Sequence, residues 1–204
     1  MQVVEIFPSL QGEGRNQGLR CCFLRLAGCN LNCRWCDTPD SRDLYAGEDL
    51  ITDDILHRIE ETGIRYLCVT GGEPLLQPDE LLPLIRTLSS RGYTIDIETN
   101  GTLPFRQVQP YASICMDLKC PSSGERSDLS LLADIRPTDS VKCVVADEGD
   151  LDYVYDQIRS IPIRGGIYIS PVHGSNYTRI AEMVMTWDLP VRLQLQLHKQ
   201  IGVQ

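Results

Sequence analysis

Seven short apolar runs, separated by segments of helical periodicity, constrain the fold of this chain more than any other feature. They occupy residues 21–28, 66–72, 94–101, 113–119, 140–147, 166–172 and 191–197. Most of these runs lack strict alternation of apolar and polar residues, which is typical of strands buried on both faces of a parallel sheet. We therefore predict about seven strands in an α/β arrangement.

The segments between the runs predict four helices, at residues 51–63, 78–92, 150–160 and 177–187. Thr52 is expected to cap the first helix, because a hydroxyl group accepts hydrogen bonds from free backbone N–H groups. Gly63 is expected to end it, because glycine tolerates the left-handed turn that follows a helix. Pro83 lacks an N–H group, so an irregular first turn is expected in the second helix.

Strands that alternate with helices form right-handed βαβ units, and these units roll a parallel sheet towards a barrel. A complete eight-fold barrel needs about 250 residues, whereas this chain has 204. We therefore predict a single domain, residues 1–204, with the α/β fold of an abbreviated, partial (β/α) TIM-like barrel. The motifs GGEP, ETNG, DLK and SPVHG follow predicted strands, at the end of the sheet where barrel active sites lie.

The net charge of −9 weighs against non-specific binding to nucleic acid, which requires a basic surface. No run of about 18 apolar residues is present, and the N-terminal stretch lacks the regions of a signal peptide, so neither membrane binding nor secretion is expected. We expect a cytosolic protein. In that reducing compartment its nine cysteines serve as metal ligands, catalytic groups or core residues more often than as disulfides.

Cys29, Cys33 and Cys36 stand close together in the stretch CNLNCRWC. One interpretation is a structural zinc site, which needs a fourth ligand from Cys21, Cys22 or a histidine. The other is a four-iron cluster with only three protein ligands, which leaves one iron open to bind and activate a small molecule. On the second interpretation, the missing fourth cysteine is the functional feature.

Two motifs in this order resemble the radical S-adenosylmethionine superfamily. CNLNCRWC has its CxxxCxxC pattern, and GGEP at residues 71–74 resembles its methionine-binding motif. The resemblance implies a barrel of the radical S-adenosylmethionine type, in which the open iron binds the amino and carboxylate groups of the cofactor. One electron then cleaves a carbon–sulfur bond and yields a 5′-deoxyadenosyl radical, which takes hydrogen from the substrate. The protein orients the reactants and excludes water and oxygen.

Along essentially the whole chain, the stretches EIFPSLQGEG, FLRLAGCNLNCRWCDT and LQLHKQIGVQ resemble the 7-carboxy-7-deazaguanine synthase family. The resemblance implies a radical ring contraction of 6-carboxy-5,6,7,8-tetrahydropterin, with loss of ammonia, in the biosynthesis of queuosine and other deazapurines. It also implies a [4Fe-4S] cluster, S-adenosylmethionine and Mg²⁺ as cofactors. The implied partners are a second copy of the chain in a homodimer and an external electron donor similar to flavodoxin or ferredoxin.

The same resemblance assigns the residues of the cluster and the cofactors. Cys29, Cys33 and Cys36 are the cluster ligands, and Thr38 is the Mg²⁺ ligand, with a helix N-cap as its alternative role. The residues expected to bind S-adenosylmethionine are Trp35, Asp37, Gly72, Glu73, Asp117, Lys119, Ser170, Pro171, Val172 and His173.

Structural alternatives stay open for several of these residues. Trp35 would serve equally as a hydrophobic lid over the cluster, GGEP as a turn before a helix, and SPVH as an irregular rim of the barrel. DLK stands where the family often has serine-proline-lysine, so Asp117 and Lys119 match the family only in part. Glu98 and Asn100 of ETNG are expected to contact cofactor or substrate, or to form a polar turn.

The residues expected to bind the substrate are Leu10, Gln11, Gly12, Glu13, Arg25, Thr70, His198 and Gln204. The first four belong to a loop whose backbone can read the edge of a pterin ring. Arg25 lies in an apolar strand, where an unpaired charge is costly, so the carboxylate of the substrate is its expected partner. The alternative for Arg25 is an internal ion pair with a glutamate.

Two other functions remain compatible with the sequence. One is an activating enzyme for a glycyl-radical protein, which would share the cluster but act on a protein backbone. The other is a non-enzymatic zinc-binding module. An assay with the pterin separates the first from the synthase, and colour separates the second, because a cluster protein is brown and a zinc protein is colourless.

Overall fold

The computed structural model describes residues 1–203 and contains one nine-stranded sheet with the strand order β3-β1-β2-β4-β5-β6-β7-β8-β9. The strands are β1 (Gln2–Leu10), β2 (Arg20–Leu26), β3 (Glu48–Asp49), β4 (Tyr66–Gly71), β5 (Thr94–Thr99), β6 (Ser113–Leu118), β7 (Ser140–Val145), β8 (Gly166–Pro171) and β9 (Val191–Leu193). From β2 to β9 all neighbouring strands pair in parallel, and these seven strands coincide with the seven apolar runs of the sequence.

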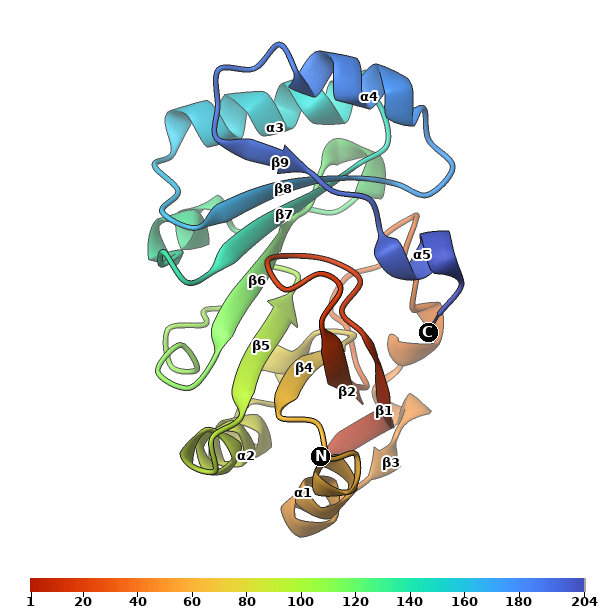
Figure 1. The fold of residues 1–204 in the computed structure, drawn as a ribbon, viewed down its shortest axis with the longest axis vertical. Helices are drawn as coiled ribbons and strands as arrows, with labels where there is room; N and C mark the ends of the chain where they lie inside the picture. The colour runs from red at the N-terminus through yellow and green to blue at the C-terminus, as the bar shows by residue number, and fades with distance from the viewer. Residues whose placement is uncertain (204) are drawn as a thin grey trace.

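Two strands were not expected from the sequence, and both are antiparallel. β1 pairs with β2, with a shift of register between Val3 and Glu5, and β3 pairs with the start of β1. Figure 1 shows β3 and β9 at opposite ends of the curved sheet, and the two strands are not paired with each other. The sheet therefore curves without closing, which confirms the prediction of a partial barrel.

The helices are α1 (Thr52–Glu61), α2 (Pro78–Ser90), α3 (Glu148–Ser160), α4 (Tyr177–Val184) and α5 (Leu197–Ile201). The first four match the predicted helices, whereas α5 was not expected. The N-cap of α1 is Ile51 rather than Thr52, and its side chain makes no capping hydrogen bond. Pro83 lies inside α2 without ending it. None of the helices among residues 1–203 is long and apolar enough to cross a membrane.

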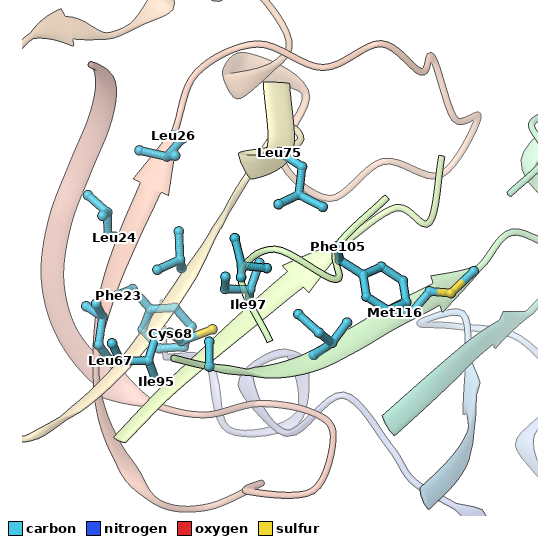
Figure 2. Close-up of a cluster of buried hydrophobic side chains, with 14 of the residues drawn as sticks. Phe23, Leu24, Leu26, Leu67, Cys68, Leu75, Ile95, Ile97, Phe105 and Met116 are labelled. Atoms are coloured by element: carbon cyan, nitrogen blue, oxygen red, sulfur yellow. The ribbon is translucent and has the colours of Figure 1, made fainter. Parts of the chain in front are cut away.

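The core fills the space between the sheet and the outer helices. Figure 2 shows part of it, where side chains from β2, β4 and β5, such as Leu24, Leu67 and Ile97, pack with Phe105 and Met116. All five of these side chains are fully buried. Burial of such apolar area is the main favourable term in folding, and here it fixes the carboxyl ends of the parallel strands side by side.

The loop between β1 and β2, residues 11–19, crosses the open side of the sheet, and we call it the crossing loop. Figure 1 shows α1–α4 around the outside of the curved sheet, with the crossing loop and α5 on its inner side. Hydrogen bonds join the loop to both halves of the molecule: Asn16 Nδ2 donates to Asp96 of β5, and the backbone N–H of Leu197 donates to Gly12 O.

Candidate active site

A cavity of about 550 Å³ opens at the carboxyl ends of the parallel strands. Its walls are the crossing loop, the segment that carries the three clustered cysteines, the ends of β4, β5 and β6, and the start of α5. Of the predicted site residues, those that line it are Cys29, Cys33, Cys36, Trp35, Asp37, Thr38, Gly72, Asp117, Lys119, Val172, His173, Leu10, Gln11, Gly12, Glu13, Arg25, Thr70 and His198. Glu98 and Asn100 line it as well. Residues as far apart in the sequence as Leu10 and His198 therefore meet in one cavity.

Cys29, Cys33 and Cys36 are half-buried on the loop that follows β2. Two backbone hydrogen bonds hold this loop: Cys29 N donates to Arg42 O at 3.0 Å, and Arg34 N donates to Ser123 O at 2.9 Å. Burial raises the pKa of the Cys29 and Cys33 thiols. A metal must therefore displace their protons when it binds.

The arrangement of these thiols fits an iron–sulfur cluster better than zinc. Among residues 1–203, no group of three or more His, Cys, Asp or Glu side chains is arranged to hold a single metal ion. Structural zinc needs four ligands around one ion. The cysteines of a four-iron cluster bind separate irons, so they need not converge on one point. Three thiols that share one cavity wall meet that requirement.

Gly71 and Gly72 allow the chain after β4 to pass directly beside the cysteine loop. A Cβ atom on Gly72 would lie 2.0 Å from Gly28 O, and a Cβ atom on Gly71 would lie 2.1 Å from Leu26 O. In this close contact Gly72 N donates to Leu26 O at 3.0 Å, and Glu73 N donates to Gly28 O at 2.7 Å. Only glycine fits at these two positions, and Gly71 also has a φ of +131°, which side chains disfavour.

The side chain of Glu73 is buried and does not line the cavity, and its contact with the cofactor stays a prediction. Its exposed fraction is 0%, and its carboxylate accepts hydrogen bonds from Leu75 N, Thr99 Oγ1 and Asn100 N. Burial raises its pKa, against the effect of these donors. The structure therefore makes Glu73 a cap of the 3₁₀ turn Pro74–Leu76 that joins two strand ends.

Asp117 and Lys119 face the cavity as an ion pair, with Lys119 Nζ 2.7 Å from Asp117 Oδ2. Burial disfavours the charged form of Asp117. The ammonium groups of Lys119 and Lys142 outweigh this effect and hold the pKa of Asp117 below its usual value. The ring of Trp35 lies beneath Lys119 Nζ, 5.8 Å from the ring centroid, and its Nε1 donates to Ser122 Oγ at 3.0 Å. Trp35 is thus fixed at the wall of the cavity beside the cysteines.

The segment SPVH is divided between the wall and the interior. Val172 and His173 line the cavity. Ser170 and Pro171 are buried and do not line it, and their contact with the cofactor stays a prediction. Ser170 Oγ donates to Glu13 Oε1 at 3.3 Å, so it supports a residue of the crossing loop.

Gln11 and Thr70 share one carboxylate at the floor of the cavity. Gln11 Nε2 donates to Glu98 Oε1 at 3.1 Å, and Thr70 Oγ1 donates to Glu98 Oε2 at 3.1 Å. Burial raises the pKa of Glu98, while the nearby ammonium of Lys142 acts in the opposite sense. The carboxylate still has acceptor capacity for a ligand, because each oxygen offers two lone pairs.

Arg25 lines the cavity but also has a partner within the protein. Its Nε lies 2.7 Å from Glu5 Oε1, and its guanidinium lies over the ring of Phe7, 5.6 Å from the centroid. The side chain keeps an exposed fraction of 15%. The internal ion pair that the sequence left as the alternative is therefore present, at a place where a bound ligand would also meet the arginine.

Thr38, Asp37 and His198 meet on one side of the cavity. Thr38 precedes the 3₁₀ turn Pro39–Ser41, and its side chain makes no capping hydrogen bond, so the alternative role as a helix cap is not what the structure shows. His198 Nε2 lies 3.8 Å from Asp37 Oδ2, and the ring packs against Gly12. Burial lowers the pKa of His198, against the opposing effect of Glu13 and Asp37. Gln204 lies outside the described residues.

Sequence reasoning missed Lys142 and Gln196, both of which line the cavity. Lys142 lies in the middle of β7, and Gln196 precedes α5. Both contact Glu13: Lys142 Nζ donates to Oε2 at 2.6 Å and Gln196 Nε2 to Oε1 at 3.2 Å. The signal for Lys142 was available, because it is a charge within an apolar strand, the same feature that identified Arg25.

Comparisons with known proteins now place the chain in a class. The family model of the radical SAM superfamily matches residues 24–118, the part of the chain that holds the three cysteines and GGEP. With its open α/β sheet and its cysteine-lined cavity, the chain is an enzyme of this class, and its cofactors are a [4Fe-4S] cluster and S-adenosylmethionine. More narrowly, it belongs to the 7-carboxy-7-deazaguanine synthase family.

Relatives support this assignment along the full length of the chain. A 7-carboxy-7-deazaguanine synthase of Methanospirillum hungatei is 50% identical, over 100% of this chain and 86% of the relative. One of Thermoplasma acidophilum is 35% identical, over 98% and 97%. The crystal structure of QueE from Escherichia coli has a TM-score of 0.76 and 26% identity, over 97% of this chain and 94% of that chain. The crystal structure of Streptococcus suis SuiB has a TM-score of 0.62 and 13% identity, over 88% of this chain and 50% of that chain. This likeness shows a shared fold alone.

Proposed function

We propose that the enzyme converts 6-carboxy-5,6,7,8-tetrahydropterin into 7-carboxy-7-deazaguanine with loss of ammonia, a step in the biosynthesis of queuosine and other deazapurines. The observation that carries the proposal is the cavity itself, whose volume of about 550 Å³ is lined by the three cysteines, by residues of the crossing loop and by Glu98. The family membership shared along the whole chain supports the same reaction.

The cysteine side of the cavity is the proposed cofactor side. Cys29, Cys33 and Cys36 would each hold one iron, which leaves the fourth iron of the cluster without a protein ligand. When bound, the cluster and S-adenosylmethionine supply one-electron cleavage of a carbon–sulfur bond and a radical that takes hydrogen from the substrate. Lys119 offers an ammonium group to a cofactor carboxylate, and Trp35 offers an apolar wall that excludes water.

The crossing-loop side is the proposed substrate side. A pterin presents N–H donors along one edge, and Glu98 offers carboxylate acceptors to such an edge. Gln11 and Thr70 fix the orientation of that carboxylate. Arg25 and His198 offer donors to the carboxylate of the substrate from the wall of the same cavity.

Magnesium is proposed to bind beside Thr38. Mg²⁺ keeps several waters and readily accepts oxygen atoms of a substrate, so one protein ligand suffices. Thr38 lines the cavity, and its hydroxyl does not cap the turn that follows it, which supports such a role. We also propose a homodimer, a flavodoxin-like or ferredoxin-like electron donor and a cytosolic location, all three on the family membership.

An anaerobic assay tests the reaction. The reconstituted enzyme is mixed with the tetrahydropterin, S-adenosylmethionine, Mg²⁺ and a chemical reductant, and the products are identified by mass spectrometry. We expect 7-carboxy-7-deazaguanine and ammonia in equal amounts. Omission of the pterin, S-adenosylmethionine or the reductant should stop their formation, and omission of Mg²⁺ should slow it. A brown enzyme that cleaves the cofactor but leaves the pterin unchanged would overturn the proposal and favour an activating enzyme.

A further inference from the structure

Lys142 is the one charged residue of β7 and is buried there. Its side chain keeps an exposed fraction of only 6%, and its neighbours Val141 and Cys143 are fully buried. Replacement of a buried ion pair by well-packed apolar side chains often leaves stability unchanged or raises it. Stability alone therefore does not account for a lysine here, and its position at the wall of the cavity suggests a role in the site.

The ammonium group of Lys142 joins two carboxylates that come from distant parts of the chain. Nζ lies 2.6 Å from Glu13 Oε2 and 3.2 Å from Asp117 Oδ1. The second contact is an ion pair without the alignment of a hydrogen bond. Asp117 Oδ2 in turn lies 2.7 Å from Lys119 Nζ. A row of four charges of alternating sign thus runs from the crossing loop to the end of β6, and its net charge is zero. Its members in order are Glu13, Lys142, Asp117 and Lys119.

Glu13 is one of the points at which the far half of the sheet holds the crossing loop, beside the bonds of Gly12 and Gly14 to the segment after β9. Besides Lys142 of β7, its carboxylate accepts from Ser170 at the end of β8 and from Gln196 after β9. The strands that carry the loop, β1 and β2, are separated from β7 by β4, β5 and β6. Their ladder hydrogen bonds therefore cannot fix the loop at this distance. Other contacts must do so, among them the backbone bond from Leu197 N to Gly12 O and the side-chain contacts of Glu13.

We propose that Lys142 is a positioning residue that, through the Glu13 carboxylate, holds the crossing loop across the open side of the sheet in the geometry that receives the substrate. Because Lys142 also contacts Asp117, it links the loop to the Lys119 side of the cavity. The effect on substrate binding rests on the proposed function, whereas the anchoring of the loop does not.

Hydrogen exchange tests the anchoring, using the cluster-loaded enzyme and its Lys142→Met variant. The crossing loop has amide protons that can report on it, because the N–H groups of Gly14, Gly18 and Leu19 are hydrogen-bonded. We expect exchange within residues 11–19 to become about tenfold faster or more, while α1 and α2 exchange at the wild-type rate. Lys142→Arg keeps the charge and should restore most of the protection.

Steady-state kinetics tests the consequence for the site. In Lys142→Met the KM for the tetrahydropterin should rise about tenfold or more, as expected when a loop that contacts a ligand loses its order. The visible spectrum of the cluster should change little, because the cysteines are not touched. An unchanged KM together with unchanged exchange in residues 11–19 would overturn the proposal.

Two further variants separate positioning from stability. Cys143→Ala removes a buried side chain from the adjacent position of β7, and exchange should then rise throughout β7 but not selectively in the crossing loop. Lys142→Met combined with Glu13→Gln removes one charge of each sign, so it serves if the single variant does not fold. Wild-type exchange of the loop in that double variant would show that Lys142 only neutralises Glu13 and would overturn the proposal.

The outcomes also separate this inference from the proposed reaction. Selective loosening of the crossing loop in Lys142→Met, in an enzyme whose wild type makes no product from the pterin, supports the anchoring and rejects the proposed function. Product formation by the wild type, with no selective loosening in the variant, rejects the anchoring and leaves the reaction in place.

Discussion

Gly72→Ala should damage the site without touching any polar side chain. The added methyl group would lie 2.0 Å from Gly28 O and 2.9 Å from Ser41 O, both of which are backbone atoms that cannot rotate away. Relief of this overlap must separate the end of β4 from the loop that begins at Cys29. Two hydrogen bonds bridge that gap, from Gly72 N to Leu26 O and from Glu73 N to Gly28 O.

The expected loss of stability has two parts. Overpacking of a well-packed contact costs about 1–3 kcal/mol, and each lost backbone hydrogen bond costs about 0.5–1.5 kcal/mol. Together they predict a decrease of about 2–6 kcal/mol in the free energy of unfolding. For a chain of this length, each kcal/mol lowers the melting temperature by about 2–4 °C, so a decrease of roughly 4–24 °C is expected.

Urea unfolding of the metal-free chain, followed by circular dichroism, measures the free energy of unfolding. Iron bound per chain after reconstitution measures whether the cysteine loop still holds the cluster. Both should fall in Gly72→Ala. Gly149→Ala is the matched control, because its methyl group meets only Asp147 Oδ1, at 3.3 Å, within α3, where alanine is favoured over glycine by up to about 1 kcal/mol. If Gly72→Ala unfolds within about 1 kcal/mol of wild type and binds the full cluster, the reasoning from the close backbone contact is refuted.

Three further substitutions test the proposed ligands. Cys33→Ala should abolish the brown chromophore and all cleavage of S-adenosylmethionine, and retention of both would show that Cys33 is not a cluster ligand. Thr38→Ala should keep the cluster spectrum but lose most of the stimulation by Mg²⁺, whereas an unchanged Mg²⁺ dependence would remove Thr38 from the metal site. Arg25→Gln should weaken substrate binding about tenfold to a hundredfold, because a hydrogen bond to a charged group contributes roughly 1.5–3 kcal/mol. Normal substrate binding with a lower melting temperature would leave Arg25 as the structural partner of Glu5.

The parallel part of the fold could be predicted from the sequence because buried parallel strands are apolar throughout. All seven apolar runs became strands, and the four helical segments became α1–α4. β1 was missed because Pro8 and the charged Glu5 interrupt its pattern, and its pairing with β2 is irregular beside Glu5. α5 has five residues, which is too short for a helical period to be recognised.

For the site, the sequence predicted which strand ends meet but not the direction of each side chain. Parallel register brings the ends of β4, β5 and β6 to one edge, so Thr70, Glu98 and Asp117 face one cavity. Glu73 and Ser170 turn into the interior, because the tight turn after β4 and the contact with the crossing loop decide their direction. Neither feature can be read from spacing alone.

The crossing loop explains how a chain too short for a complete barrel still encloses a cavity. A closed barrel seals its wall by strand pairing, whereas here the loop spans the gap and bonds to the segment after β9: Gly14 N donates to Gln194 Oε1 at 2.7 Å and Leu197 N to Gly12 O at 3.0 Å. These contacts join residues about 180 positions apart. Such contacts are non-local, and their cost in chain entropy is offset by the other contacts of the sheet. The loop that is proposed to receive the substrate is therefore also the wall that completes the cavity. A substitution that destabilises β1 or the segment after β9 should therefore impair substrate binding before it impairs binding of the cluster by the cysteines.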